Sequence, residues 1–265
     1  MGIIMPLVKS LDKYDAFVID LDGVIYLRHD PVEGAKEFVA ALEEAGRGFM
    51  FLTNNSSRTR GDYVERLAGF GIEVTEGRVM TSAYATCLYL QEKHPGSRVF
   101  VVGEDGLKRE LEGGGMEIAE DGPIELVVAG IDLHFTYEKL RKASVLIRSG
   151  AKFISTNRDA TYPTERGLFP GAGSIVSAIQ TASGRRPINI GKPSRRIFNL
   201  CLKSLSVHPG RAASIGDRYE TDILGGIRAG MGTVMVLSGV TRAGGVELYR
   251  DQPDLVVESV GDLVR

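Results

Sequence analysis

The sequence predicts an α/β protein in which a Rossmann-like, doubly wound parallel sheet is interrupted by a second α/β domain. Short apolar runs alternate with segments of helical period near the N-terminus, and the same alternation resumes near the C-terminus. The segment between them carries its own set of strand-like and helix-like runs. We therefore expect residues 1–81 and 186–265 to form the core, and residues 82–185 to form an inserted cap domain.

The two outer segments supply the elements of the predicted core. Apolar runs bounded by turn residues predict buried strands, and apolar positions three and four apart predict amphipathic helices. The predicted strands are residues 16–21, 49–53, 212–215 and 233–237, and the predicted helices are residues 34–45, 61–70, 195–203 and 220–229.

The middle segment has enough elements for a separate small α/β layer. The same two periodicities predict strands at residues 98–102, 126–130 and 152–155, and helices at residues 83–93, 107–112 and 137–148. Residues 170–174 are rich in glycine, but they lack the full G-x-G-x-x-G pattern of a dinucleotide site. They are better interpreted as the start of a helix.

Composition excludes several classes of protein. The chain has 265 residues, is 43% hydrophobic and carries a formal net charge of -2 without a basic cluster. We therefore expect no nucleic acid or membrane partner, and no run approaches the ~18 apolar residues of a spanning helix. Cys87 and Cys201 are far apart, which argues against a disulfide framework or a CxxC zinc site and favours the cytoplasm. The histidines show no metal-ligand spacing, so any metal should be bound by oxygen.

Two carboxylates close the first predicted strand. Asp20 and Asp22 follow the apolar run 16–19 and precede Gly23. In an open α/β sheet, residues beyond the carboxyl ends of the strands line the ligand crevice. Such a pair can hold a hard divalent cation, act as nucleophile and general acid, or do both. The alternative is an ordinary Asp-Gly turn.

Two further clusters could grip a phosphate. Residues 53–57, which include Thr53, Asn54 and Asn55, follow a strand and can bind phosphate through side chains and free backbone N–H groups. The alternative is a helix N-cap, although five polar residues exceed what capping needs. Lys192, between Gly191 and Pro193, suits phosphate as a point charge, or it is a surface lysine in a loop.

A fourth cluster repeats the geometry of the first. Asp217 follows the predicted strand 212–215, and Asp222 lies about a helical turn further on. Strand-end acids on one edge would repel one another unless a cation lay between them, so we place Asp217 in the site. Asp222 could instead be a capping or helix-dipole carboxylate.

Together the four clusters resemble the four signature motifs of the haloacid dehalogenase superfamily. Their order and separations carry the resemblance: strand-D-x-D-G, strand-T-N-N, G-K-P and strand-G-D-x(4)-D. Within this superfamily, the sequence resembles the 4-nitrophenylphosphatase, or NagD-like, branch more closely than the others. Four further stretches resemble that branch: residues 156–159, 162–163, 170–174 and 237–241. The resemblance covers nearly the whole chain, and no motif position departs from the pattern.

The resemblance implies a phosphatase that forms an aspartyl phosphate. Asp20 would be the nucleophile, and Asp22 would protonate the leaving oxygen and later deprotonate water. Attack by a carboxylate on a phosphate dianion requires a cation nearby. Mg²⁺ would be held by Asp20, Asp217 and the backbone carbonyl of Asp22, whose side chain should point away from the metal.

The remaining motif residues would bind the phosphoryl oxygens or support that site. The phosphate would be contacted by Thr53, Asn54, Asn55 and Lys192. Asp222 would not touch the phosphate but would orient Lys192 or the ligands of Mg²⁺ from the second layer. In the cap domain, the stretch that resembles the family's specificity loop contains Asn157, Asp159 and Tyr162. For these three the alternative is turn chemistry around Pro163.

The expected partner is a small soluble phosphate ester, and relatives of this kind are often homodimers. The candidate substrates include sugar phosphates, nucleoside monophosphates, glycerol phosphate, phosphoglycolate and pyridoxal phosphate. One alternative is a phosphotransferase that uses the same aspartyl phosphate. Another is a signalling module with a phosphorylated Asp, which is disfavoured because Asp22 supplies a second acid suited to hydrolysing the intermediate. A dehalogenase would not need a phosphate clamp or three acids around a cation.

Overall fold

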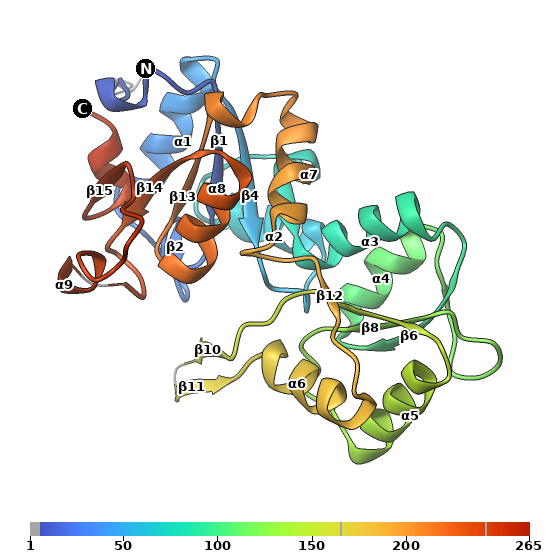
Figure 1. Ribbon diagram of the computed structural model, residues 1–265. Coiled ribbons are helices and arrows are strands. Elements are labelled where there is room, and N and C mark those ends of the chain that lie inside the picture. Colours follow the sequence, from blue (N-terminus) through green and yellow to red (C-terminus); the bar gives the residue numbers. More distant parts are fainter. Residues whose placement is uncertain (1–5, 165, 242) are drawn as a thin grey trace. The chain divides into compact units, whose positions relative to one another are not determined.

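The computed structural model describes residues 6–164, 166–241 and 243–265 (Figure 1). Its tertiary contacts divide the chain into two units. The first unit comprises residues up to Thr53 together with Val64–Met80 and Lys192–Arg265, and the second comprises Asn54–Tyr63 and Thr81–Gly191. The second unit thus contains the segment 82–185, together with residues 54–63 and Thr81 before it and residues 186–191 after it. The boundaries at residues 82 and 185 stay a prediction.

The first unit contains a six-stranded sheet in the order β15-β14-β13-β1-β4-β5. Two elements, α2 (Arg60–Gly69) and β5 (Val79–Thr81), span the division between the units. The other elements of this unit are η1 (Lys9–Leu11), β1 (Ala16–Asp20), β2 (Tyr26–Leu27), β3 (Asp30–Pro31), α1 (Ala35–Glu44), β4 (Gly48–Thr53), η2 (Glu76–Arg78), α7 (Arg195–Leu205), η3 (Pro209–Arg211), β13 (Ala212–Gly216), the π-helical turn η4 (Tyr219–Ile223), α8 (Leu224–Ala229), β14 (Gly232–Val236), α9 (Ala243–Val246), β15 (Leu255–Val257) and η5 (Val260–Leu263).

The sheet of the first unit is built around β1. This strand pairs in parallel with β4 on one side and with β13 on the other. The chain winds outward through β4 and β5, and later through β13, β14 and β15, so the strand order reverses at β1. Phe17, Val18 and Ile19 are at most 1% exposed, and Phe38 of α1 packs edge-on against Phe17. The predicted doubly wound fold is confirmed, and its switch point lies at the carboxyl end of β1.

The second unit has its own parallel sheet, in the order β12-β9-β8-β6-β7. Its elements are α3 (Ser82–Lys93), β6 (Arg98–Val102), α4 (Asp105–Gly113), β7 (Glu117–Ile118), β8 (Leu126–Ala129), α5 (Tyr137–Arg148), β9 (Lys152–Ser155), β10 (Thr161–Thr164), β11 (Gly167–Pro170), α6 (Ala172–Ser183) and β12 (Ile188–Asn189). A buried apolar cluster connects β6, β8 and β9 with α5 and α6. The glycine-rich stretch does lead into a helix, α6.

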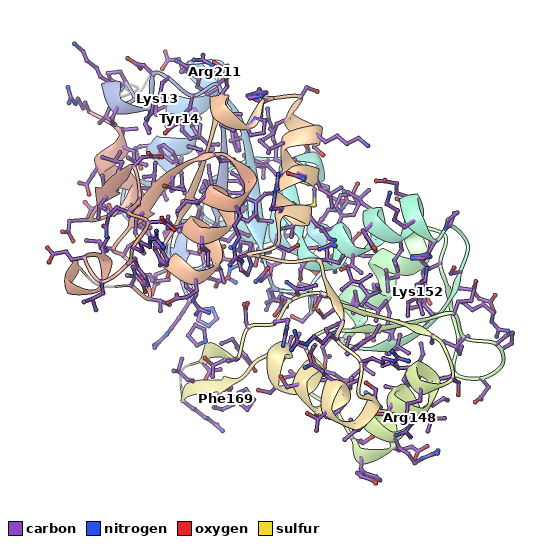
Figure 2. All side chains as sticks on the ribbon, viewed as in Figure 1. Lys13, Tyr14, Arg148, Lys152, Phe169 and Arg211 are labelled. Carbon is purple, nitrogen blue, oxygen red and sulfur yellow. The ribbon has the colours of Figure 1, made fainter. Side chains whose placement is uncertain are left out.

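A two-stranded hairpin, β10-β11, stands apart from the larger sheet of the second unit. Tyr162 of β10 pairs with Phe169 of β11, and their rings meet edge-on at 6.3 Å. Figure 2 shows Phe169 on this hairpin, where it is 40% exposed. Neither of these two strands was predicted from the sequence.

Candidate active site

Two acidic residues emerge side by side at the carboxyl edge of the first unit's sheet. Asp20 is the last residue of β1, and Asp217 directly follows β13. The two strands are parallel neighbours, with Ile19 opposite Ile215. The strand pairing therefore produces the convergence that the sequence predicted.

The loop after β1 packs closely on Asp217. Gly23 has a φ of 88°, a conformation that glycine adopts without strain. A Cβ at Gly23 would collide with the Asp217 carboxylate, and so would a Cβ at Gly239. The backbone N–H of Val240 donates to Asp217 Oδ2 at 2.6 Å. Asp217 is thus fixed by close backbone approach from two loops.

Lys192 is a buried cation shared by two carboxylates. Its side chain is 3% exposed, and Nζ donates to Asp20 Oδ1 at 2.7 Å and to Asp222 Oδ1 at 2.6 Å. Burial lowers the pKa of Lys192, but Asp20 and Asp222 outweigh burial and raise it, so the ammonium stays charged. A surface lysine is excluded by this geometry.

Asp222 belongs to the short π-helical turn η4 and is buried. Its Oδ2 accepts hydrogen bonds from the Thr221 hydroxyl at 2.9 Å and from the Arg218 N–H at 3.3 Å. Its backbone carbonyl accepts from Ser214 Oγ at 3.1 Å. Because Asp222 Oδ1 accepts a hydrogen bond from Lys192 Nζ, Asp222 orients that lysine. Asp222 Oδ2 also makes a capping-type contact, with the N–H of Arg218 at the start of η4.

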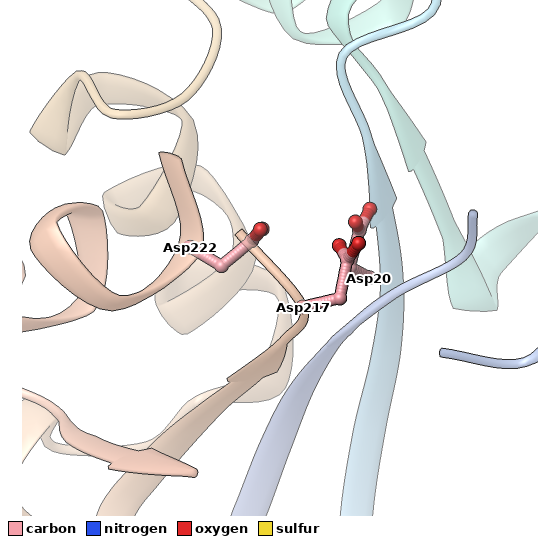
Figure 3. Close-up of side chains that lie close together, drawn as sticks. All are labelled: Asp20, Asp217 and Asp222. Carbon is pink, nitrogen blue, oxygen red and sulfur yellow. The ribbon is translucent and has the colours of Figure 1, made fainter. Parts of the chain in front are cut away.

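Asp20, Asp217 and Asp222 form a cluster that could hold a metal ion (Figure 3). One carboxylate oxygen from each lies within 4.8 Å of the others. Burial, Asp222 and Asp217 raise the pKa of Asp20 well above its usual range, although Lys192 opposes them. Burial and Asp222 raise the pKa of Asp217 to about 6. Three carboxylates, two of them buried, stand against one ammonium, and carboxylate oxygens are the ligands that hard divalent cations prefer.

The side chain of Asp22 lies outside this cluster. It is exposed, and Oδ2 accepts a hydrogen bond from the Tyr26 hydroxyl at 3.4 Å. Gly23, next to Asp22, accepts a further hydrogen bond on its carbonyl from Ser238 Oγ at 2.6 Å. Neither Tyr26 nor Ser238 was predicted from the sequence to lie beside the site. For Tyr26 a signal was present, because a tyrosine within the apolar run after D-G has a hydroxyl that needs a polar neighbour.

The polar run after β4 is divided between the two units. Thr53 ends β4 in the first unit and is buried. Asn54 begins the second unit, and its amide donates to both carboxylate oxygens of Asp159 at 3.1 Å. Asn55 Oδ1 accepts from the N–H and the hydroxyl of Ser57, each at 2.8 Å. Phosphate binding by Thr53, Asn54 and Asn55 stays a prediction.

Two of the three predicted specificity residues meet the polar run. Asn157 donates through Nδ2 to the Asn54 carbonyl at 2.7 Å, and its Oδ1 accepts from the Asp159 N–H at 3.1 Å. Asp159 binds the Asn54 amide. Tyr162 lies instead in the hairpin, against Phe169. The structure therefore joins Asn157 and Asp159 to Asn54 and places Tyr162 elsewhere in the second unit.

Comparisons with known proteins agree with this arrangement. A family model described as haloacid dehalogenase-like hydrolase matches residues 17–117, and a HAD-hydrolase-like model matches residues 189–263. The chain is 38% identical to the 5'-nucleotidase YutF of Bacillus subtilis over 254 residues, which cover 96% of this chain and 99% of that protein. The chain belongs to the haloacid dehalogenase-like hydrolases.

Further relatives place the chain within this family. It is 41% identical to an acid sugar phosphatase of Staphylococcus aureus, over 87% of this chain and 89% of that protein. The crystal structure of a 4-nitrophenylphosphatase from Thermotoga maritima superposes with a TM-score of 0.92 at 36% identity, covering 97% of this chain and 98% of that one. The resemblance to the 4-nitrophenylphosphatase, or NagD-like, branch is confirmed. The chain is a phosphatase of the haloacid dehalogenase-like family. Among its described residues, no helix has the length and apolar character needed to cross a membrane.

Proposed function

We propose that this phosphatase hydrolyses small phosphate monoesters through an aspartyl phosphate formed on Asp20, with Mg²⁺ as the cofactor. The observation that carries the proposal is the sharing of Lys192 between Asp20 and Asp222, beside Asp217. Lys192 fixes Asp20 Oδ1 and so orients the carboxylate that attacks phosphorus. Asp20, Asp217 and the backbone carbonyl of Asp22 would hold Mg²⁺, which would supply positive charge to the phosphoryl oxygens.

The proposed reaction has two steps. In the first, an Asp20 oxygen forms a bond to phosphorus, the ester P–O bond breaks, and Asp22 gives its proton to the departing oxygen. In the second, Asp22 removes a proton from water, which attacks the aspartyl phosphate and releases inorganic phosphate and the Asp20 carboxylate. Lys192 and Thr53 would offset the negative charge of the phosphoryl group in both steps.

The proposed substrates are small soluble phosphate monoesters. The names of the relatives support this range, since they include a 5'-nucleotidase, an acid sugar phosphatase and a 4-nitrophenylphosphatase. Both cysteines are free thiols, which suits the reducing cytoplasm proposed as its location. A panel of metabolite phosphates ranked by kcat/KM would identify the preferred ester.

The nucleophile is tested by Asp20→Asn, with Asp15→Asn as the control. Asp15 is an exposed acid just before β1, paired with Arg211. We expect Asp20→Asn to lower turnover of 4-nitrophenyl phosphate about a thousandfold or more, because the amide is not a nucleophile, whereas Asp15→Asn keeps wild-type turnover. Turnover should require added Mg²⁺ after treatment with EDTA.

The intermediate is tested separately by chemical trapping. Hydroxylamine attacks an acyl phosphate and releases phosphate, so quenching during turnover should leave a hydroxamate on residue 20, detectable by peptide mass spectrometry. Asp22→Asn should increase the trapped fraction, since water then lacks its base. An Asp20→Asn variant that retains most of its activity, or turnover without any trapped hydroxamate, would contradict the mechanism.

A further inference from the structure

The backbone carbonyl of Asn54 accepts hydrogen bonds from two side chains of the second unit. Ser82, the first residue of α3, donates through Oγ at 2.5 Å, and Asn157, shortly after β9, donates through Nδ2 at 2.7 Å. Both donors are buried, with exposed fractions of 0% and 4%. They lie 28 and 103 residues further along the chain. Two donors match the two lone pairs of a carbonyl oxygen, so the backbone at Asn54 is held from two directions.

The side chain of Asn54 is held by the same unit. Its amide donates to both carboxylate oxygens of Asp159 at 3.1 Å, and the Asp159 N–H donates in turn to Asn157 Oδ1 at 3.1 Å. The backbone and the side chain of Asn54 therefore belong to one polar network. The residue bonded to Asn54 is Thr53, the last residue of β4 in the first unit. Thr53 thus follows a paired strand and precedes an anchored residue.

The chain returns to the first unit at Gly191, which is anchored on the same loop. The Gly191 N–H donates to the Thr156 carbonyl at 2.8 Å, and the Gly191 carbonyl accepts from Asn189 Nδ2 at 2.9 Å. A Cβ at Gly191 would collide with the Thr156 carbonyl and with Asn54 Oδ1. The residue after Gly191 is Lys192. The loop that anchors Asn54 therefore anchors the residue before Lys192 as well.

We propose that Ser82 and Asn157 are positioning residues for the phosphate site. By fixing the Asn54 carbonyl, they hold Thr53 in the orientation that binds the phosphoryl group. In this role neither side chain touches the ester. Asn157 then acts through the backbone and does not recognise the leaving group, which is the role that the family resemblance implied. The inference rests on the proposed function, in which Thr53 and Lys192 offset the charge of the phosphoryl group.

The two roles of Asn157 give different patterns across substrates. Every substrate has the phosphoryl group, so a displaced Thr53 lowers kcat/KM by the same factor for esters with unlike leaving groups, and it weakens the binding of inorganic phosphate. A lost contact with the leaving group lowers kcat/KM by factors that differ between esters and leaves phosphate binding unchanged. Partial unfolding lowers kcat for every ester but does not alter the inhibition constant of phosphate.

The direct test is to compare Ser82→Ala and Asn157→Ala at saturating Mg²⁺, with 4-nitrophenyl phosphate and with the ester that ranks first in the metabolite panel. We expect each variant to lower both kcat/KM values about fivefold and to raise the inhibition constant of inorganic phosphate by a similar factor, the weight of about one hydrogen bond. Gln91→Ala is the matched control. Gln91 Nε2 donates to the Gly114 carbonyl at 3.1 Å, elsewhere in the second unit, and its loss should change none of these values.

Thr53→Val links the effect to the phosphate site. It keeps the shape of the side chain and removes the hydroxyl, so it should raise the inhibition constant of phosphate more than Ser82→Ala does. Adding Ser82→Ala to Thr53→Val should then have less effect than Ser82→Ala has on the wild type, because both changes act through the same hydroxyl. Ser82→Ala is the cleaner probe, since Asn157→Ala also removes the acceptor of the Asp159 N–H. Melting temperatures confirm that each variant is folded in the assay.

The outcomes separate this inference from the function on which it rests. If Thr53→Val leaves kcat/KM and phosphate inhibition unchanged, the phosphate role of Thr53 is wrong, and the inference is wrong with it. If Thr53→Val weakens phosphate inhibition but Ser82→Ala does not, only the positioning role is overturned. If Asn157→Ala changes the ratio of the two kcat/KM values and leaves phosphate inhibition at its wild-type strength, Asn157 contacts the leaving group and is not a positioning residue.

Discussion

Lys192 shows how much of the site a sequence can reveal at the scale of single residues. Parallel strands deliver their carboxyl ends to one edge, which was sufficient to predict Asp20 and Asp217 in one place, whereas the place of Lys192 beside them was implied by the family resemblance of the G-K-P motif. The resemblance implied that Asp222 orients Lys192 or the Mg²⁺ shell, but the second hydrogen bond of Lys192, to Asp20, was not predicted. The position of Asp222 depends on the π-helical turn η4, a rare backbone form without a sequence signature.

We expect Thr221→Val to lower kcat/KM for 4-nitrophenyl phosphate about tenfold. The Thr221 hydroxyl donates to Asp222 Oδ2, and Oδ1 of the same carboxylate receives Lys192. Without the hydroxyl, Asp222 can rotate and Lys192 loses its fixed position beside Asp20; hydrogen bonds to charged groups contribute about 1.5–3 kcal/mol. Steady-state kinetics with and without saturating Mg²⁺ measure the effect.

The matched variant for this prediction is Thr221→Ser, which keeps a hydroxyl at the same position. It should retain most of the wild-type kcat/KM, whereas a purely steric role would make serine, the smaller residue, the more damaging change. A Thr221→Val enzyme with kcat/KM within about twofold of wild type would show that Asp222 is held adequately by the Arg218 N–H and its other contacts.

At the scale of elements, each of the seven strands that periodicity predicted lies within one residue of an observed strand, and all but one of the seven predicted helices lie within two residues of an observed helix; the exception, 220–229, is divided into η4 and α8. Strand β6 (98–102) and helix α5 (137–148) occupy the predicted residues. Hairpin β10-β11 was missed because a proline lies within β10 and its residues are exposed or half-buried, so neither alternation nor a continuous apolar run marks it. Strand β12 has only two residues, too few to show a period.

Helix α3 contains a buried thiol whose ionisation should make the stability depend on pH. Cys87 is 2% exposed, and a Cβ at Gly114, just after α4, would collide with its sulfur. Burial, with a smaller contribution from Glu110, raises the pKa of Cys87 from an ordinary value of 9.0 to about 11. Between these values the unfolded chain loses the proton while the folded chain keeps it. The free energy of unfolding therefore falls as the pH rises through this window.

Urea unfolding of the wild type and of Cys87→Ala at pH 8 and pH 10 measures this effect. Between pH 8 and pH 10, the free energy of unfolding of the wild type should fall by about 1 kcal/mol more than that of Cys87→Ala. This is the fall expected for a single group whose pKa differs by about two units between the folded and unfolded states. Cys201, a buried residue of α7, is the same in both proteins and cancels in the comparison. Equal losses in the two proteins would mean that Cys87 ionises in the folded state as readily as in the unfolded state.

At the scale of the whole molecule, the chain contains two units with separate sheets and separate cores. The sequence predicted an insertion because a second set of βα units interrupts the first. It could not place residues 54–63, whose neighbours are distant in sequence. The Thr156 hydroxyl donates to Ser56 Oγ at 3.2 Å, and Gly106 lies so close to Ser57 that a Cβ on it would collide with the Ser57 carbonyl. Contacts between residues about 50 to 100 positions apart in sequence therefore assign this segment to the second unit.

The division into two units predicts that Mg²⁺ stabilises only one of them. The carboxylates proposed to bind it, Asp20 and Asp217, belong to the first unit, and a ligand that binds only the folded form stabilises the cooperative unit that contains its site. Hydrogen–deuterium exchange measured with Mg²⁺ and with EDTA should therefore show slower exchange of β1 and β13 in Mg²⁺. Strands β6 and β8, which have their own buried core, should exchange at the same rate in both. Asp217→Asn should abolish the difference in β1 and β13, while equal slowing of all four strands would mean that the two units unfold as one.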